Sequence, residues 1–322
     1  MLRRVILGET GIETSCLGFG CASLGSRVPA EAGARALAAA IEAGVTWLDL
    51  APVYGGGRAE EIAAGVIRGR RDRLQIATKV GLGLAGGAGG GLRRAVMPFA
   101  RRAAHLMGGG VAARLRGAAP KANSRLPLTP DLLAGSLEAS LVRLGTDHVD
   151  LFALHGVSAA EVGREEILRA LEDLRASGKT RAVAVAGDAA AAAAALAFPY
   201  GVLQLPLPAP GDTDGTRLLA RARAAGRGLV THSVFGPGGP DPALRARVAA
   251  AAGVPADGDG PARVLMARAF ALNPEGVVLV SMFSDRSRAA NLLAAAEDPK
   301  AAPRDLRGFA RVPGEDPLAA LA

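Results

Sequence analysis

Four polar residues of types that hold or transfer protons stand at the ends of strand-like segments. Asp49 ends the second of these segments and Tyr54 follows it by five residues, while Lys79 follows the third segment and His155 the fourth. Carboxyl ends of neighbouring parallel strands meet on one rim, where barrel enzymes build their active sites. We therefore expect the four side chains to converge.

This set of side chains suits the reduction of a carbonyl group. As hydride reaches the carbonyl carbon, negative charge develops on the oxygen, and a nearby group must donate a proton to it. Tyr54 is a weak acid with an ordinary pKa of about 10, so Lys79 is expected to lower that pKa and Asp49 to hold the lysine. His155 can donate a hydrogen bond that orients the carbonyl and stabilises the alkoxide. The chemistry requires no metal, and the sequence shows no metal-ligand spacing.

The strand-like segments number eight and alternate with helical ones, which is typical of parallel strands joined by helical crossovers. They span residues 16–19, 45–49, 74–78, 149–153, 181–185, 202–205, 228–231 and 277–280. With 322 residues, the chain fits one α/β domain, a (β/α)8 or TIM barrel. Residues 3–7 and 12–15 predict an N-terminal β-hairpin that closes the bottom of the barrel.

Helix signals lie between these segments. Thr129 is a capping residue, Pro130 suits the first helical position, and Gly145 is a typical stop, so we predict a helix between them. The first helix is expected to open at Pro29 and to end at Gly44.

Residues 81–127 interrupt this alternation after the third strand. The segment is too long for an ordinary strand-to-helix loop, and its glycine run at 86–91 leads into a mixture of arginines and apolar residues. We predict a mobile lid over the active site in preference to a solvated loop, because the loops after the strands build the sites of such barrels.

Composition restricts the partners and the compartment. The net charge of +8 and the pI near 10.4 predict an anionic partner, but aromatic residues make up only 3% and the arginines are scattered, which argues against nucleic acid. Cys16 and Cys21 lie about 16 Å apart along one predicted strand, too far for a disulfide. No signal peptide or membrane span is evident, so we expect a cytoplasmic protein.

Three motifs around the polar residues resemble the aldo-keto reductase family: LDLAPVYGGGRAEE, IATKVG and LFALHG, with SLEASLVRLGTDHVDL ahead of the last. The resemblance covers nearly the whole chain apart from residues 81–127. It implies a (β/α)8 barrel that transfers hydride between a nicotinamide cofactor and a small carbonyl or alcohol substrate. In that family the tetrad of Asp49, Tyr54, Lys79 and His155 is catalytic, with the tyrosine as general acid and base.

The resemblance also implies residues that bind the cofactor. They lie after the first, fifth, sixth, seventh and eighth strands: Gly20, Cys21, Ala22, Gly187, Gln204, His232, Ser233, Val234, Gly236, Arg286, Arg288 and Asn291. The run from Gly18 to Ser23 is not a Rossmann fingerprint, because serine replaces the third glycine.

The chain departs from the family pattern near the nicotinamide. Ala186 and Gly187 replace the usual Ser-Asn, so the side-chain hydrogen bonds to the carboxamide are expected to be lost. His232 replaces the usual stacking tyrosine and brings a group that titrates near neutral pH.

A third departure concerns the adenosine 2'-phosphate. The arginine that holds this phosphate aligns with Ser287, although Arg286 and Arg288 flank it and either can take its place. We predict NADPH as the cofactor, with NADH as the alternative.

Other functions stay open at this stage. The first is the reverse reaction, an aldose dehydrogenase that oxidises a sugar hemiacetal to a lactone with Tyr54 as base. The second is a non-catalytic relative that binds nucleotide, and the third an unrelated barrel enzyme. The sequence determines neither the substrate nor the oligomeric state.

Overall fold

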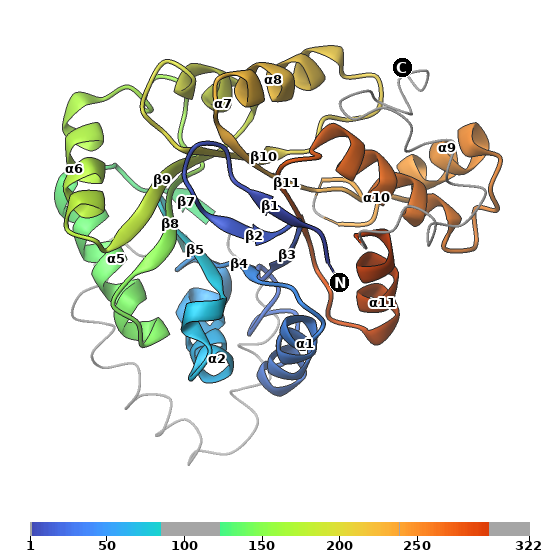
Figure 1. The fold of residues 1–322 in the computed structure, drawn as a ribbon, viewed down its shortest axis with the longest axis horizontal. Helices are drawn as coiled ribbons and strands as arrows, with labels where there is room; N and C mark the ends of the chain where they lie inside the picture. The colour runs from blue at the N-terminus through green and yellow to red at the C-terminus, as the bar shows by residue number, and fades with distance from the viewer. Residues whose placement is uncertain (1, 85–122, 238, 296–322) are drawn as a thin grey trace. The chain divides into compact units, whose positions relative to one another are not determined.

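Eight parallel strands close into a barrel in the computed structural model, which describes residues 2–84, 123–237 and 239–295 (Figure 1). Around the barrel they are β3 (Leu17–Gly20), β4 (Trp47–Asp49), β5 (Gln75–Val80), β8 (Val149–His155), β9 (Thr180–Ala186), β10 (Val202–Pro206), β11 (Gly228–His232) and β12 (Val277–Val280). All eight predicted strands are present within a few residues of their expected ends, so the predicted (β/α)8 barrel is confirmed.

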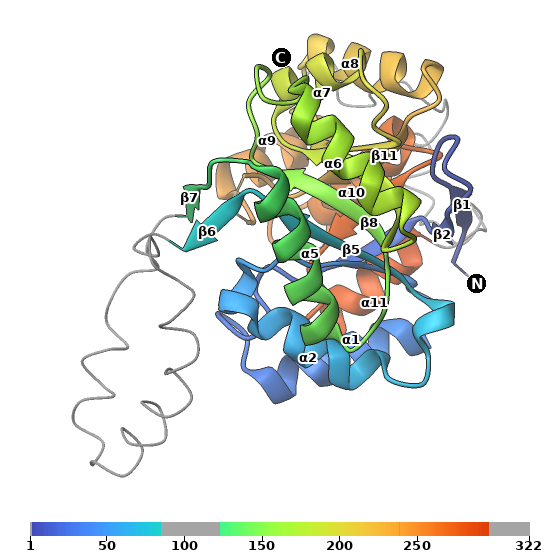
Figure 2. The ribbon, with the colours of Figure 1, turned by 90° about the vertical axis from the view of Figure 1, so that its left-hand side faces the viewer.

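Helices follow the strands and cover the outside of the barrel (Figures 1 and 2). They are α1 (Ala30–Glu42), α2 (Arg58–Ile67), α5 (Pro130–Leu144), α6 (Glu165–Ala176), α7 (Ala189–Ala195), α8 (Thr213–Ala224), α9 (Pro242–Ala252), α10 (Gly260–Leu272) and α11 (Asp285–Ala294). Within the described ranges, every helix is too short or too polar to serve as a membrane span.

The limits of α5 follow from its sequence signals. The side chain of Thr129 accepts a hydrogen bond from the backbone N–H of Leu132 at 3.1 Å, which satisfies one of the free donors of the first turn. Gly145 ends the helix with φ of 66°, a left-handed conformation that favours glycine. Leu133 and Leu137 lie on its buried face, as their spacing predicts.

The N-terminal hairpin consists of β1 (Arg4–Ile6) and β2 (Glu13–Ser15), which pair antiparallel as predicted. It lies in front of the barrel in Figure 1 and at one end of it in Figure 2. Gly8 has φ of 51° and lies so close to the turn before β11 that a Cβ would come 2.3 Å from the carbonyl oxygen of Gly226. The hairpin therefore closes the amino-terminal end of the barrel.

Residues 82–127 form the second of two compact units in the chain. Its described part is an antiparallel pair of strands, β6 (Leu82–Leu84) and β7 (Asn123–Arg125). The rest of the predicted lid, residues 85–122, lies outside the described residues. The lid and the assignment of residues 1–322 to one domain therefore stay predictions.

Candidate active site

The four predicted residues lie at the carboxyl ends of three neighbouring barrel strands. Asp49 is the last residue of β4, Lys79 is the next to last of β5, and His155 is the last of β8. Tyr54 opens a short 3-10 helix, η1 (Tyr54–Gly57), which follows β4. The parallel pairing of β4 with β5 and of β5 with β8 sets these ends side by side.

The Lys79 ammonium joins the other groups. Its Nζ donates to Oδ1 of Asp49 at 2.7 Å, to the carbonyl oxygen of Leu50 at 2.9 Å and to the hydroxyl of Tyr54 at 3.4 Å. Lys79 and Asp49 are both buried. Burial by itself lowers the pKa of Lys79, but Asp49 and then Tyr54 more than offset this, so the pKa lies above its ordinary value. The lysine is therefore a fixed cation next to the phenol.

Tyr54 keeps its proton more firmly than the sequence suggests. Burial raises the pKa of Tyr54 to about 12, which Lys79 offsets only in part and to which Asp49 adds. The prediction of a lowered pKa was therefore wrong for the net effect, although Lys79 does act in the predicted direction. The physical reason is that burial disfavours the charged phenolate, and that Asp49 opposes the effect of the lysine's charge.

His155 is a neutral imidazole at the edge of this cluster. Its ring meets the ring of Tyr54 edge-on, with centroids 6.1 Å apart and an interplanar angle of 89°. Burial, with Lys79 and His232 adding to it, lowers the pKa of His155 to about 3. At neutral pH the ring is therefore neutral and has one N–H to donate.

Two predicted cofactor-binding residues lie against the tetrad. Gln204, buried on β10, donates from Nε2 to Oδ1 of Asp49 at 3.0 Å, and its Oε1 is a buried acceptor without a partner in the described parts of the chain. His232 ends β11, where its Nδ1 lies 2.9 Å from Oγ of Ser233. Burial lowers the pKa of His232, although Asp49 opposes this. Both side chains therefore belong to the same rim.

The residues after β3 and β9 also reach this rim. The backbone N–H of Cys21 donates to the carbonyl oxygen of Asp49 at 3.1 Å, and the Cys21 thiol is free and buried, which raises its pKa. Gly20 ends β3 and precedes this thiol, while Ala22 is exposed beside it. At the end of β9 the N–H of Gly187 donates to the carbonyl oxygen of Gln204 at 3.0 Å.

Comparison with known proteins shows the family of this chain. Residues 16–238, more than half of the chain, match the model of the Aldo/keto reductase family. The chain belongs to the aldo/keto reductase family. A 6-dehydroglucose reductase of Agrobacterium fabrum is 31% identical over 191 residues, which cover 58% of this chain and 54% of that protein. An aldo-keto reductase of Bacillus subtilis is 27% identical over 186 residues, which cover 56% of this chain and 45% of that protein. The chain spans about half the length of the curated relatives it matches.

Solved aldo-keto reductases share the fold. One from Bacillus halodurans, in its holo form, superposes with a TM-score of 0.70 at 19% identity and covers 100% of this chain and 97% of its own. Another, from Klebsiella pneumoniae in complex with NADPH, has a TM-score of 0.60 at 22% identity. The alignment covers 92% of this chain and 90% of that one. At these identities the likeness is one of fold.

The loop after β11 turns sharply at the site of this aldo/keto reductase. Ser233 has φ of 61°, a left-handed value that is uncommon outside glycine, and Gly236 has φ of 111°. The N–H of Gly236 closes the turn on the carbonyl oxygen of Ser233 at 3.0 Å, and Val234 is buried inside it. The predicted run from His232 to Gly236 is thus one compact turn beside the tetrad.

The three predicted adenosine-binding residues share α11 and differ in environment. Arg286 pairs with Asp259, Nη2 to Oδ1 at 2.8 Å, and is exposed, whereas the half-buried Arg288 pairs with Asp285. Asn291 is buried on the same helix. A 2'-phosphate would have to compete with a carboxylate for either arginine.

A buried ion pair behind the tetrad was missed by sequence reasoning. Oε2 of Glu60, a fully buried residue of α2, lies 2.5 Å from Nε of Arg143 on α5, and Oε1 accepts from the hydroxyl of Thr78 at 2.7 Å. Thr78 points out of the barrel next to Lys79, so the pair holds β5 against two helices. The available signal was a hydroxyl on an otherwise apolar outward face of β5. Among the described residues, no group of His, Cys, Asp or Glu is arranged to hold a metal ion.

Proposed function

We propose that this chain is an NADP(H)-dependent oxidoreductase that reduces an aldehyde or ketone, with Tyr54 as the general acid. The observation that carries the proposal is the hydrogen bonding of Lys79 Nζ, which joins Oδ1 of Asp49 to the hydroxyl of Tyr54 on the active-site rim. A cation fixed next to a phenol stabilises the phenolate that remains after the proton leaves.

A nicotinamide cofactor fits the residues present. Gln204 Oε1 is a buried acceptor without a partner among the described residues, and a nicotinamide carboxamide offers N–H donors of the kind that such an acceptor needs. Gln204 and the turn from His232 to Gly236 would hold the ring and the phosphates, and Asn291 the adenine. When bound, the cofactor supplies the hydride.

The protein's own residues then handle one proton. Because its pKa is about 12, Tyr54 is protonated at neutral pH and can give its proton to the carbonyl oxygen. Lys79 and Asp49 hold the resulting phenolate in place, while the neutral His155 donates a hydrogen bond to the same oxygen. The proton lost from Tyr54 is replaced from solvent after each turnover.

Replacement of Tyr54 by Phe tests this role. The change keeps the ring and removes the proton donor, so kcat should fall by about 10²- to 10⁴-fold, the usual size of a general acid–base effect. The dissociation constant of NADPH should stay unchanged, because the hydroxyl hydrogen-bonds to Lys79 and not to a residue assigned to the cofactor. Turnover like that of the wild type would rule Tyr54 out as the acid.

Oxidation of a sugar is the second candidate. A sugar as substrate is supported by the match to a 6-dehydroglucose reductase, although that relative is named for reduction and not for oxidation. This direction needs the phenolate as base, and a pKa of about 12 makes that form scarce at neutral pH. Initial rates in both directions separate the candidates: oxidation should rise about tenfold per pH unit below that pKa, while reduction should not.

A further inference from the structure

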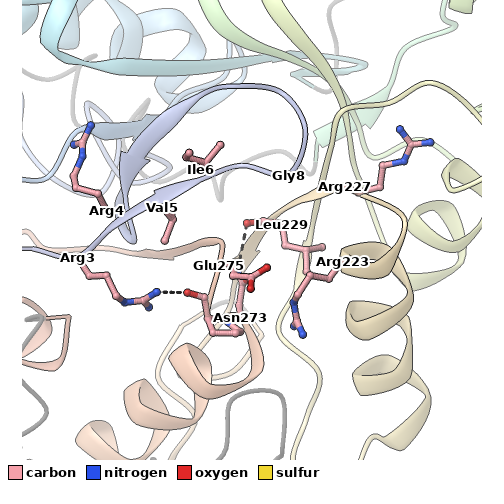
Figure 3. Close-up of a pocket in the computed structure, with 11 residues that line it drawn as sticks. Arg3, Arg4, Val5, Ile6, Gly8, Arg223, Arg227, Leu229, Asn273 and Glu275 are labelled. Atoms are coloured by element: carbon pink, nitrogen blue, oxygen red, sulfur yellow. Dashed lines mark hydrogen bonds between the residues drawn. The ribbon is translucent and has the colours of Figure 1, made fainter.

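A polar cavity lies at the end of the barrel opposite to Tyr54. Its volume is about 390 Å³, within the range of small-molecule sites (Figure 3). Leu229, the second residue of β11, lines it, whereas His232 at the other end of the same strand faces the tetrad. The polar side chains that line the cavity are Arg3, Arg4, Arg223, Arg227, Asn273 and Glu275.

These residues come from three places that the fold brings together. Arg3 and Arg4 belong to the start of the N-terminal hairpin, Arg223 and Arg227 to the end of α8 and the turn before β11, and Glu275 to the connection between α10 and β12. In Figure 3, Arg3 and Arg223 lie on either side of Glu275. The cavity is thus assembled from segments more than 200 residues apart in the sequence.

The lining has an excess of positive charge. Arg4 pairs with Glu13 at 3.1 Å, but in the parts of the chain that the structure describes Arg3, Arg223 and Arg227 make no ion pair. Glu275 is exposed and is the single acidic residue of the lining. Three of the residues that line the cavity are therefore arginines without an ion pair among the described residues, and one lining residue is a carboxylate.

Backbone carbonyls occupy only part of the donor capacity of these arginines. Arg223 Nη2 donates to the carbonyl oxygen of Leu272 at 2.7 Å, Arg227 Nη2 to that of Phe198 at 3.1 Å, and Arg3 to that of Pro274. Each guanidinium has five N–H groups, and within the described part of the chain Nε of both Arg223 and Arg227 is buried without a hydrogen-bond partner. These bonds to carbonyl oxygens account for one hydrogen bond of each arginine. They do not account for the presence of several arginines in the lining of one cavity.

We propose that this cavity binds a small molecule that carries a multivalent oxyanion, with a phosphate ester or a pyrophosphate as the best match. Guanidinium groups bind such oxyanions through paired N–H donors, and a multivalent anion can engage two or three of them at once. The site is separate from the proposed function, because it lies at the amino-terminal end of the strands, away from the rim that holds Tyr54.

Calorimetric titration of the full chain with pyrophosphate, at constant ionic strength, tests the proposal. Wild type should bind pyrophosphate both with and without saturating NADPH, because the two sites are separate. The double variant Arg223→Gln/Arg227→Gln should bind about tenfold more weakly or worse, since two charged hydrogen-bond donors are lost. Arg221→Gln is the matched control: Arg221 lies exposed on the same helix and does not line the cavity.

A second variant protects the test against misfolding of the first. Glu275→Gln changes an exposed residue and removes the repulsion between its carboxylate and the ligand, so pyrophosphate should bind several-fold more tightly. The proposal is overturned if wild type binds no pyrophosphate, if NADPH abolishes the binding, or if the folded double variant or Glu275→Gln binds like wild type. Failure of NADPH to bind would contradict the proposed function and leave this site unaffected.

Discussion

At the carboxyl-terminal rim of the barrel a buried ammonium is paired with a carboxylate, whereas at the opposite end three guanidinium groups are held by carbonyl oxygens. Lys79 is fixed by Asp49 and can act only on what lies beside it, which is the hydroxyl of Tyr54. Arg3, Arg223 and Arg227 line a cavity and make no ion pair among the described residues. The difference teaches that a cation paired with a carboxylate serves a reaction at a fixed atom, while unpaired cations are available to an incoming anion.

Removal of Lys79 should have the largest effect on stability. Lys79→Met leaves Asp49 buried without its cation and should lower the free energy of unfolding by about 3–5 kcal/mol, measured in urea. Arg223→Gln at the other end of the barrel leaves no carboxylate unpaired. It should lower the free energy of unfolding by less, by about 1.5–3 kcal/mol. The comparison between the two ends fails if Lys79→Met is no more destabilising than Arg223→Gln.

The double variant Lys79→Met/Asp49→Asn sharpens this result. With the carboxylate neutralised, most of the lost stability should return, because the unpaired charge is gone. Turnover should stay absent, since neither a cation nor its partner remains beside Tyr54. Recovery of both stability and turnover would contradict the role of Lys79.

Acid should destabilise the protein in part through His155. The unfolded state takes up a proton near pH 6.5, while in the folded state the pKa is about 3. The folded state thus binds fewer protons in this window, and its stability falls as pH drops from about 6.5 towards 3, by up to about 1.4 kcal/mol per unit. Urea unfolding at two pH values should show a shallower fall for His155→Gln, and equal slopes would disprove the burial effect.

The smallest expected effect concerns cofactor preference. If Arg288 holds the 2'-phosphate, Arg288→Gln should weaken NADPH binding about tenfold and leave NADH binding unchanged, since NADH lacks that phosphate. Arg286→Gln is the matched change two residues earlier on α11. If only Arg286→Gln weakens NADPH binding, Arg286 and not Arg288 holds the 2'-phosphate. If neither change weakens it, neither arginine of α11 selects NADPH over NADH.

Local patterns predicted the barrel and the tetrad because both depend on short stretches. Each strand is a run of β-forming residues, and Asp49, Lys79 and His155 stand at strand ends, so the closure of the barrel brings them together. The pKa of Tyr54 could not be predicted in this way, because it depends on how deeply the phenol is buried and on how far Asp49 of β4 offsets Lys79 of β5. The pair of Glu60 with Arg143 and the cluster of Arg3 with Arg223 likewise depend on side-chain placement across distant segments.

Fluorescence titration of the full chain with NADPH and with NADH tests the account most directly. Trp47, the single tryptophan, is buried on β4 two residues before Asp49, so its emission reports on the centre of the barrel. The account predicts saturable quenching by NADPH, followed by oxidation of the bound cofactor when a carbonyl substrate is added. Binding of neither cofactor would contradict it and would show that the change to Ala186 and Gly187 has removed the nicotinamide site.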